Sequence, residues 1–157
     1  MNLYKAFLLK ALELGFPHPP KIDMKQIGGI TYIAVPMQNV LIEFHGLWHS
    51  NGYDSILLSD GAKLAESNGW NYLLIEESVK HHGIILDAPN RQIKLQRMET
   101  KAVRSGLKRC VKLSELVLTH LTGKAVCLSP EQIEECTQYA LEHSVLGNKA
   151  FKKQQER

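Results

Sequence analysis

Residues 40–50 read V-L-I-E-F-H-G-L-W-H-S and place one carboxylate and two imidazoles at the end of an apolar run. The aliphatic start predicts a strand, and the turn-forming residues after Pro36 predict a break before it. Because side chains alternate along a strand, Glu43 and His45 are expected to project to the same face. The sequence therefore predicts that a carboxylate and an imidazole converge at the end of a strand.

The candidate catalytic residues of this segment are Glu43, His45 and His49, and Gly46 lets the backbone turn sharply between the two histidines. Carboxylates and imidazoles are groups that bind metal ions or transfer protons. Each residue alone is also compatible with a solvated face or a packed imidazole. The concentration of three such groups favours a site.

The segment resembles the core of the very-short-patch repair endonucleases and their phage-encoded and homing-endonuclease relatives, a branch of the PD-(D/E)XK nuclease superfamily. Those relatives carry a strand, then an I-E-F-N-G or F-T-H-G type segment, a W-H pair, and a helix ending in L-x-x-x-G-W/I before another strand. The matching residues in this chain, in order, are Ile42 to Gly46, Trp48-His49-Ser50, Asp60, Leu64, Gly69-Trp70 and Leu73 to Glu76. The resemblance spans residues 30–77, about half of the chain.

The chain departs from that family at an acidic position. The resemblance implies a metal-binding Asp in the strand before the E-x-H segment, and an ungapped comparison puts Tyr32 there. A phenol has a pKa of about 10, so it is neutral at pH 7 and a poor ligand for Mg²⁺. Three explanations stay open: Asp23, Asp54 or Asp60 supplies the acid, or Glu43 acts with one metal ion and the histidines, or the fold has lost cleavage.

The bulk properties are compatible with a small nucleic-acid enzyme without requiring one. The chain has 157 residues, a formal charge of +3 and a pI near 8.7, so its global charge is weak evidence for DNA binding. Its three cysteines form no C-x-x-C pair, which argues against a zinc ribbon or a disulfide framework and favours a reduced, cytoplasmic setting. Residues 1–16 predict an amphipathic packing helix, with no signal peptide or membrane span.

Further helices and strands are predicted from apolar periodicity and from turn-forming and helix-capping residues. Strands are expected at 30–35, 40–44 and 70–75, and the first two are expected to form an antiparallel hairpin. A helix over 53–68, a prediction that Gly61 weakens, is expected to make the crossover to the third strand. Ser129-Pro130-Glu131-Gln132 is a capping box that opens a helix through about His143. The turn at 87–90 is the strongest boundary, so the expected organisation is a nuclease-like core at 1–88 and a basic, mostly helical region at 89–157.

The region from 91 to 112 carries eight basic residues against one acid, Glu99. Most recur at steps of three or four, which predicts one basic helix face suited to a row of phosphates. The alternatives are an edge strand near residues 91–95 and an ordinary solvated face. The residues expected to contact DNA are Lys94, Arg97, Lys101, Arg104 and Lys108.

Taken with the resemblance, the expected fold is an α/β domain of restriction-endonuclease type, a mixed sheet flanked by helices with a helical carboxy-terminal part. The expected function is DNA phosphodiester cleavage, with Mg²⁺ or Mn²⁺ held by Glu43 and Asp60 and protons moved by His45 and His49. Two alternatives are a catalytically inactive DNA-binding protein on the same fold and a protein-interaction module. DNA is the expected partner, no membrane is expected, and the oligomeric state is open, a homo-oligomer included.

Overall fold

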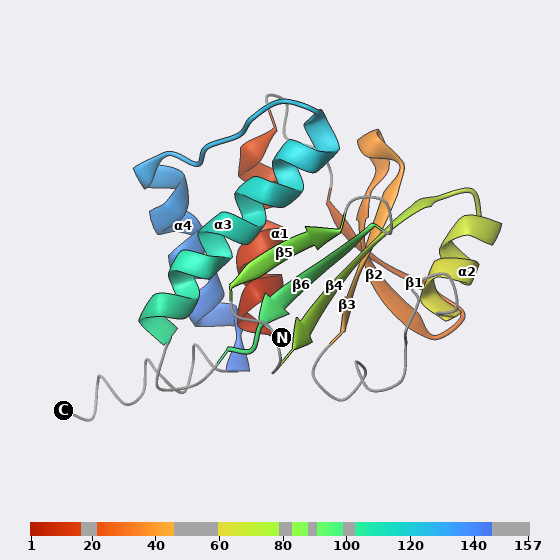
Figure 1. Ribbon diagram of the computed structural model, residues 1–157, viewed down its shortest axis with the longest axis horizontal. Helices are drawn as coiled ribbons and strands as arrows, with labels where there is room; N and C mark the ends of the chain where they lie inside the picture. The colour runs from red at the N-terminus through yellow and green to blue at the C-terminus, as the bar shows by residue number, and fades with distance from the viewer. Residues whose placement is uncertain (17–21, 46–59, 79–82, 88–90, 99–102, 146–157) are drawn as a thin grey trace. The chain divides into compact units, whose positions relative to one another are not determined.

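The computed structural model describes residues 1–16, 22–45, 60–78, 83–87, 91–98 and 103–145. The chain divides into two compact units, one formed by residues 1–20 and 98–157 and the other by residues 21–97. Over the described ranges the fold is α/β, with a six-stranded mixed, open sheet and four α-helices (Figure 1). The second unit contains the sheet and the helix α2, and the first contains the other three helices.

The sheet has the strand order β1-β2-β3-β4-β6-β5. Its first three strands form an antiparallel meander, β4 runs parallel to β3, β6 runs parallel to β4, and β5 closes the edge antiparallel to β6. The bounds are β1 Asp23–Ile27, β2 Ile30–Val35, β3 Val40–His45, β4 Asn71–Ser78, β5 Ile84–Asp87 and β6 Gln92–Gln96.

Short turns join the first three strands. Gly28 and Gly29 connect β1 to β2 with φ values of 56° and 82°, a left-handed conformation that glycine adopts without strain. The 3-10 turn η1 (Pro36–Gln38) connects β2 to β3 and ends at Asn39, which has a φ of 52°. The expected hairpin of two strands is therefore confirmed, and β1 adds a strand that periodicity did not predict.

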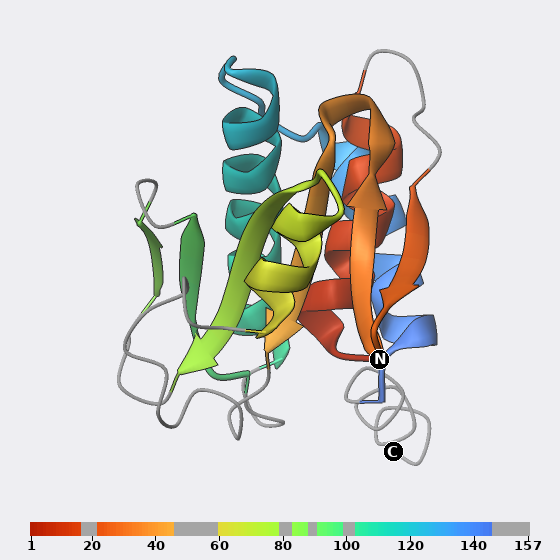
Figure 2. The same ribbon diagram turned by 90° about the vertical axis from the view of Figure 1, so that its right-hand side faces the viewer.

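Helix α2 (Asp60–Ser67) makes the crossover from β3 to the parallel strand β4 and lies against one face of the sheet (Figure 2). Ala62 and Ala65 pack in a buried cluster with residues of β2, β3 and β4, namely Tyr32, Ala34, Leu41, Tyr72 and Leu74. Gly69, with a φ of 81°, follows the helix. The strand expected after a helical crossover is confirmed, and residues 53–59 of the expected helix lie outside the described residues.

The helical unit consists of α1 (Leu3–Gly15), α3 (Val103–Thr122) and α4 (Pro130–His143). Helix α1 packs against both of the others. Its end approaches α3 closely, since a Cβ on Gly15 would lie 2.5 Å from a methyl carbon of Leu118. Gln132 Nε2 of α4 donates a hydrogen bond of 3.1 Å to the carbonyl of Leu14.

The start of α4 confirms the predicted capping box. Ser129 accepts a hydrogen bond from the Gln132 amide, and the Gln132 side chain accepts one from the Ser129 amide. Pro130 occupies the first helical turn, where its missing amide hydrogen costs nothing. This helix end is determined by local sequence, because all of its partners lie within four residues.

The expected single basic helix is wrong in its first part. Lys94 lies in β6, Arg97 follows that strand, and α3 begins only at Val103. The edge-strand alternative is also corrected, because β6 is paired on both sides. Ile93 and Leu95 of β6 are buried. The alternation of apolar and polar residues therefore determined a strand here, and the helical spacing of the basic residues did not. The sheet thus continues beyond residue 88, and the unit that contains it comprises residues 21–97.

No helix in the described ranges is long and apolar enough to cross a membrane.

Candidate functional site

The centre of the candidate site is the carboxylate of Glu43 on β3. Its Oε2 forms a short contact with Nε2 of His45, two residues further along the strand. Glu43 is 7% exposed, and the side chain of His45 is partly buried. The alternation expected from the sequence therefore brings the predicted acid and the first predicted imidazole into direct contact.

The second carboxylate oxygen of Glu43 is held by an aromatic residue of the neighbouring strand. Tyr72 Oη donates a hydrogen bond of 2.9 Å to Glu43 Oε1, and both groups are buried. This contact depends on the parallel register, in which Leu41 of β3 pairs with Tyr72 of β4. A hydrogen bond to a charged acceptor is stronger than one between neutral groups, so Tyr72 positions the carboxylate.

The first turn of α2 fits tightly over the same carboxylate. A Cβ built on Gly61 would overlap Glu43 Oε1 and would lie 3.2 Å from Tyr72 Oη. Only a residue without a side chain therefore fits between the helix and the two polar groups. Gly61, which weakened the helix prediction, has a packing reason at this position.

Tyr32 of β2 anchors α2 from the other side. Its hydroxyl donates a hydrogen bond of 2.8 Å to the carbonyl of Gly61, and its ring packs edge-on to Tyr72 with centroids 6.4 Å apart. Burial, together with the negative charge of Glu43, raises the pKa of Tyr32 to about 12. Tyr32 is thus a neutral hydrogen-bond donor that positions the helix.

The parallel register adds two charged groups to this face of the sheet. Position 45 of β3 pairs with Glu76 of β4, and Glu76 pairs with Lys94 of β6. Paired residues project to the same face, so His45, Glu76 and Lys94 form a polar row beside Glu43. The row lies toward the carboxyl ends of three parallel strands, the place where α/β sheets bind ligands.

Sequence reasoning did not identify Tyr72 or Glu76 as site residues. Both occur in W-N-Y-L-L-I-E-E, which reads simply as a buried strand with an acidic end. Counting in steps of two from Tyr72 places Glu76 on the Tyr72 face, but only the pairing with β3 identifies that face as the one containing Glu43.

The predicted metal pair is Glu43 and Asp60. Asp60 begins α2 next to Gly61 and is exposed, and no hydrogen bond or ion pair joins it to Glu43. In the described part of the chain, no three His, Cys, Asp or Glu side chains are grouped closely enough to hold a metal ion. Mg²⁺ is commonly held by only one or two carboxylates, with water and substrate phosphate completing its shell. The described donors therefore do not form an all-protein cage.

The other predicted site residues are divided between the two units. His49, Asp54 and Lys101 lie outside the described residues. Arg97 is exposed after β6 in the sheet unit. In the helical unit, three exposed residues of α3 recur at steps of four and so share one side of the helix. We call them the α3 basic stripe: Arg104, Lys108 and Lys112.

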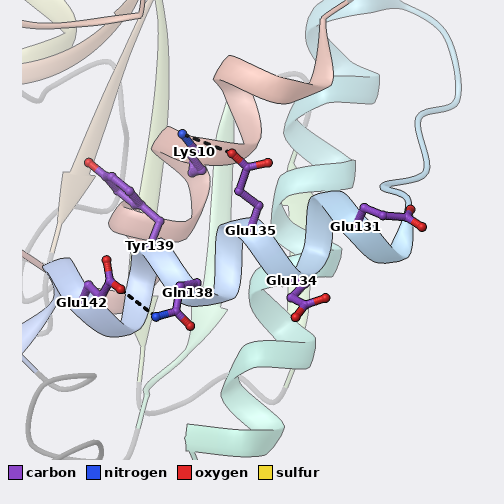
Figure 3. Close-up of a pocket in the computed structure, with 7 residues that line it drawn as sticks. All are labelled: Lys10, Glu131, Glu134, Glu135, Gln138, Tyr139 and Glu142. Atoms are coloured by element: carbon purple, nitrogen blue, oxygen red, sulfur yellow. Dashed lines mark hydrogen bonds and ion pairs between the residues drawn. The ribbon is translucent and has the colours of Figure 1, made fainter.

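A separate hollow lies on the helical unit, between α1 and α4 (Figure 3). Lys10 of α1 forms an ion pair of 3.6 Å with Glu135 of α4, and its ammonium lies 5.7 Å from the centre of the Tyr139 ring. The remaining lining side chains are polar and come from α4: Glu131, Glu134, Gln138 and Glu142. Its acidic lining disfavours phosphate, and it contains none of the predicted catalytic residues.

Comparison with known proteins matches no family model, no curated protein and no solved structure.

Proposed function

We propose that this chain is a DNA endonuclease with a restriction-endonuclease-like core. The observation that carries the proposal is the contact between Glu43 and His45 near the end of β3, in a site completed by Tyr72 and the first turn of α2. A buried carboxylate bonded to an imidazole is a combination suited to activating water for attack on phosphorus.

The order of elements supports the same proposal. In the resembled family, a strand precedes the E-x-H strand, which is followed by a helix and another strand. Here β2, β3, α2 and β4 follow in that order, and β4 lies parallel to β3. The E-x-H residues occupy the end of the central strand of this arrangement.

The proposed roles are divided among few side chains. Glu43 orients His45, which accepts a proton from the attacking water, and His49 is the second proton-transfer group. Glu43 and Asp60 would hold Mg²⁺ or Mn²⁺, which when bound neutralises charge on the scissile phosphate. Tyr72 acts as a positioning residue through its hydrogen bond to Glu43.

DNA backbone contacts are proposed for basic residues in both units. Lys94 and Arg97 belong to the sheet unit, and the α3 basic stripe belongs to the helical unit. Ammonium and guanidinium groups that contact phosphates release counterions, so binding is expected to weaken steeply with salt. The three thiols, Cys110, Cys127 and Cys136, lie in described segments and form no disulfide, which suits the proposed cytoplasmic setting.

The test is nicking of supercoiled plasmid and of short mismatched, branched and single-stranded DNAs, with Mg²⁺ or Mn²⁺. We expect the parent to cleave at least one of these and Glu43→Gln to lose at least about a hundredfold, the scale of acid–base catalysis. The matched control is Glu66→Gln, an exposed acid of α2 that pairs with Arg91, and it should cleave like the parent. Absence of cleavage by the parent on every substrate would reject the endonuclease proposal.

A second candidate is a catalytically inactive DNA-binding protein on the same core. Tyr32 favours it, because the phenol there is bonded to Gly61 and its pKa of about 12 keeps it neutral. This candidate predicts salt-sensitive DNA binding that is indifferent to divalent cations, together with no cleavage. Fluorescence anisotropy with a labelled duplex, with and without Mg²⁺, separates the two.

A further inference from the structure

Glu76 is the least expected charged group near the candidate site. The parallel pairing of β3 with β4 puts position 76 opposite His45, so Glu76 projects to the face that carries Glu43. Glu43 itself pairs with Leu74, two residues before Glu76. The two carboxylates are therefore diagonal neighbours on adjacent strands, a separation that long side chains bridge.

Glu76 is a largely buried acid, although its carboxylate oxygens are not among the fully buried side-chain atoms that lack a partner in the described part of the chain. The residue is 7% exposed, yet no hydrogen bond or ion pair joins its side chain to any residue that the structure describes. Burying an unpaired carboxylate is costly, and such groups are normally neutralised by a cation or a hydrogen-bond donor. Among the described residues no cation pairs with Glu76, so its carboxylate is available to a bound cation.

Lys94 adds a complementary charge beside Glu76. It pairs with Glu76 across β4 and β6 and so projects to the same face, but no ion pair forms between them among the described residues. An ammonium next to the Glu76 carboxylate suits a phosphate that is shared between a lysine and a cation. The arrangement also compensates for Tyr32, which leaves the usual acidic position of β2 without a charge.

We infer that Glu76 takes the place of Asp60 as the second acid of the site: with Glu43 it binds a divalent cation, and Lys94 binds a phosphate of the DNA beside it. This assignment rests on the proposed nuclease function. It places the second metal-binding carboxylate on β4, whereas the resemblance implies one on β2, two strands away in the sheet order. Two carboxylates suffice because water and a phosphate oxygen complete the shell of such an ion.

The test measures cation binding without cleavage. Mn²⁺ is titrated into the full-length protein and followed by loss of the free-ion electron paramagnetic resonance signal and by the shift in thermal midpoint. Glu76→Gln is expected to weaken binding by at least about tenfold, the lower end of what losing even an outer-sphere partner costs a metal site. The matched control is Glu77→Gln, which changes a buried acid of the same strand on the opposite face.

Stability in the absence of metal gives a second readout. Because Glu76→Gln removes a charge from a largely buried residue without breaking an ion pair of the described residues, its thermal midpoint without Mn²⁺ should be at or above that of the parent. Added Mn²⁺ should raise the midpoint of the parent and of Glu77→Gln but not that of Glu76→Gln. Where Glu76→Gln fails to fold, Glu76→Asp keeps the charge on a shorter side chain and should bind Mn²⁺ measurably but more weakly.

The outcomes separate the two proposals. If Mn²⁺ binds and stabilises Glu76→Gln as it does the parent, or if the parent binds no Mn²⁺, the assignment of Glu76 is overturned. If Glu43→Gln abolishes nicking while Glu76→Gln leaves both nicking and Mn²⁺ binding unchanged, the endonuclease proposal survives without Glu76. If only Glu76→Gln and Glu43→Gln lose Mn²⁺ binding while the parent cleaves no DNA, the cation site survives and the endonuclease proposal fails.

Discussion

Replacing Gly61 by alanine is expected to displace the Glu43 carboxylate from its hydrogen bonds. The added Cβ would overlap Oε1 of Glu43 and would lie 2.8 Å from its carboxyl carbon. The carboxylate has little room to move, because it is 7% exposed and is held by Tyr72 on one oxygen and by His45 on the other. Either α2 lifts from the sheet or the Tyr72 bond breaks.

The expected cost follows from those contacts. A hydrogen bond to a charged group contributes about 1.5–3 kcal/mol, and alanine in place of glycine gains at most about 1 kcal/mol in a helix. The net loss in the free energy of unfolding is therefore roughly 1–2 kcal/mol. In a Glu43→Ala background the overlap disappears, so the same change should be neutral or stabilising by up to about 1 kcal/mol.

The assay is urea unfolding followed by the fluorescence of Trp70, which packs against the buried cluster under α2, in a Trp48→Phe background. Gly61→Ala is measured alone and combined with Glu43→Ala, and the coupling energy between the two changes should be roughly 2 kcal/mol. An exposed α2 substitution, Lys63→Ala, serves as control and should change stability by less than about 0.5 kcal/mol. An equal cost of Gly61→Ala in both backgrounds would refute the steric reasoning.

Three further predictions concern other parts of the chain. Tyr32→Phe should remove a pH dependence of stability, because the pKa of Tyr32 is about 12 in the folded state and about 10 in the unfolded state. Between these pH values the folded parent holds more protons than the unfolded parent, so its stability should fall as pH rises. Urea midpoints of the parent should therefore fall more steeply over this range than those of the variant. Cys127 is exposed, whereas Cys136 is buried and its burial raises the thiol pKa to about 12. A thiol reagent should therefore modify Cys127 in the native protein and Cys136 only after unfolding. Equal rates of modification of the two thiols in the native protein, measured by mass spectrometry, would contradict the burial of Cys136. Replacing all three residues of the α3 basic stripe by alanine should weaken DNA binding. It should also lower the slope of the logarithm of the binding constant against the logarithm of salt concentration by about 0.9 per lost phosphate contact. The control Lys124→Ala, at an exposed position after α3, should leave that slope unchanged if the stripe is the contact surface.

Local sequence predicted the elements whose signals are short-range. The capping box before α4 needs only residues within four positions of one another, and its bonds form as expected. The alternation in β3 likewise put Glu43 and His45 on one face without knowledge of any partner strand. These features depend on backbone periodicity, which the order of residues alone determines.

In the basic segment, by contrast, the helical spacing of the charges predicted the wrong element. Lys94 and Arg97 fit a helical spacing as well as any later pair, yet Lys94 became part of β6. The competing signal was the alternation of Ile93 and Leu95, which are both fully buried in the sheet unit. Burial of two large apolar side chains is worth more than any gain from aligning charges on a solvated helix, so tertiary packing decided this segment.

The sequence by itself determined which chemical groups the site could use, since the acid and imidazole of E-x-H lie two residues apart on one strand. Only the tertiary structure decided which groups join them. Tyr72 reaches Glu43, and Glu76 shares that face, because β4 pairs with β3 in parallel and in one particular register. Gly61 reaches Glu43 because α2 crosses the same face. Register depends on contacts between residues some thirty positions apart, and a shift of one residue would turn Tyr72 and Glu76 to the opposite face.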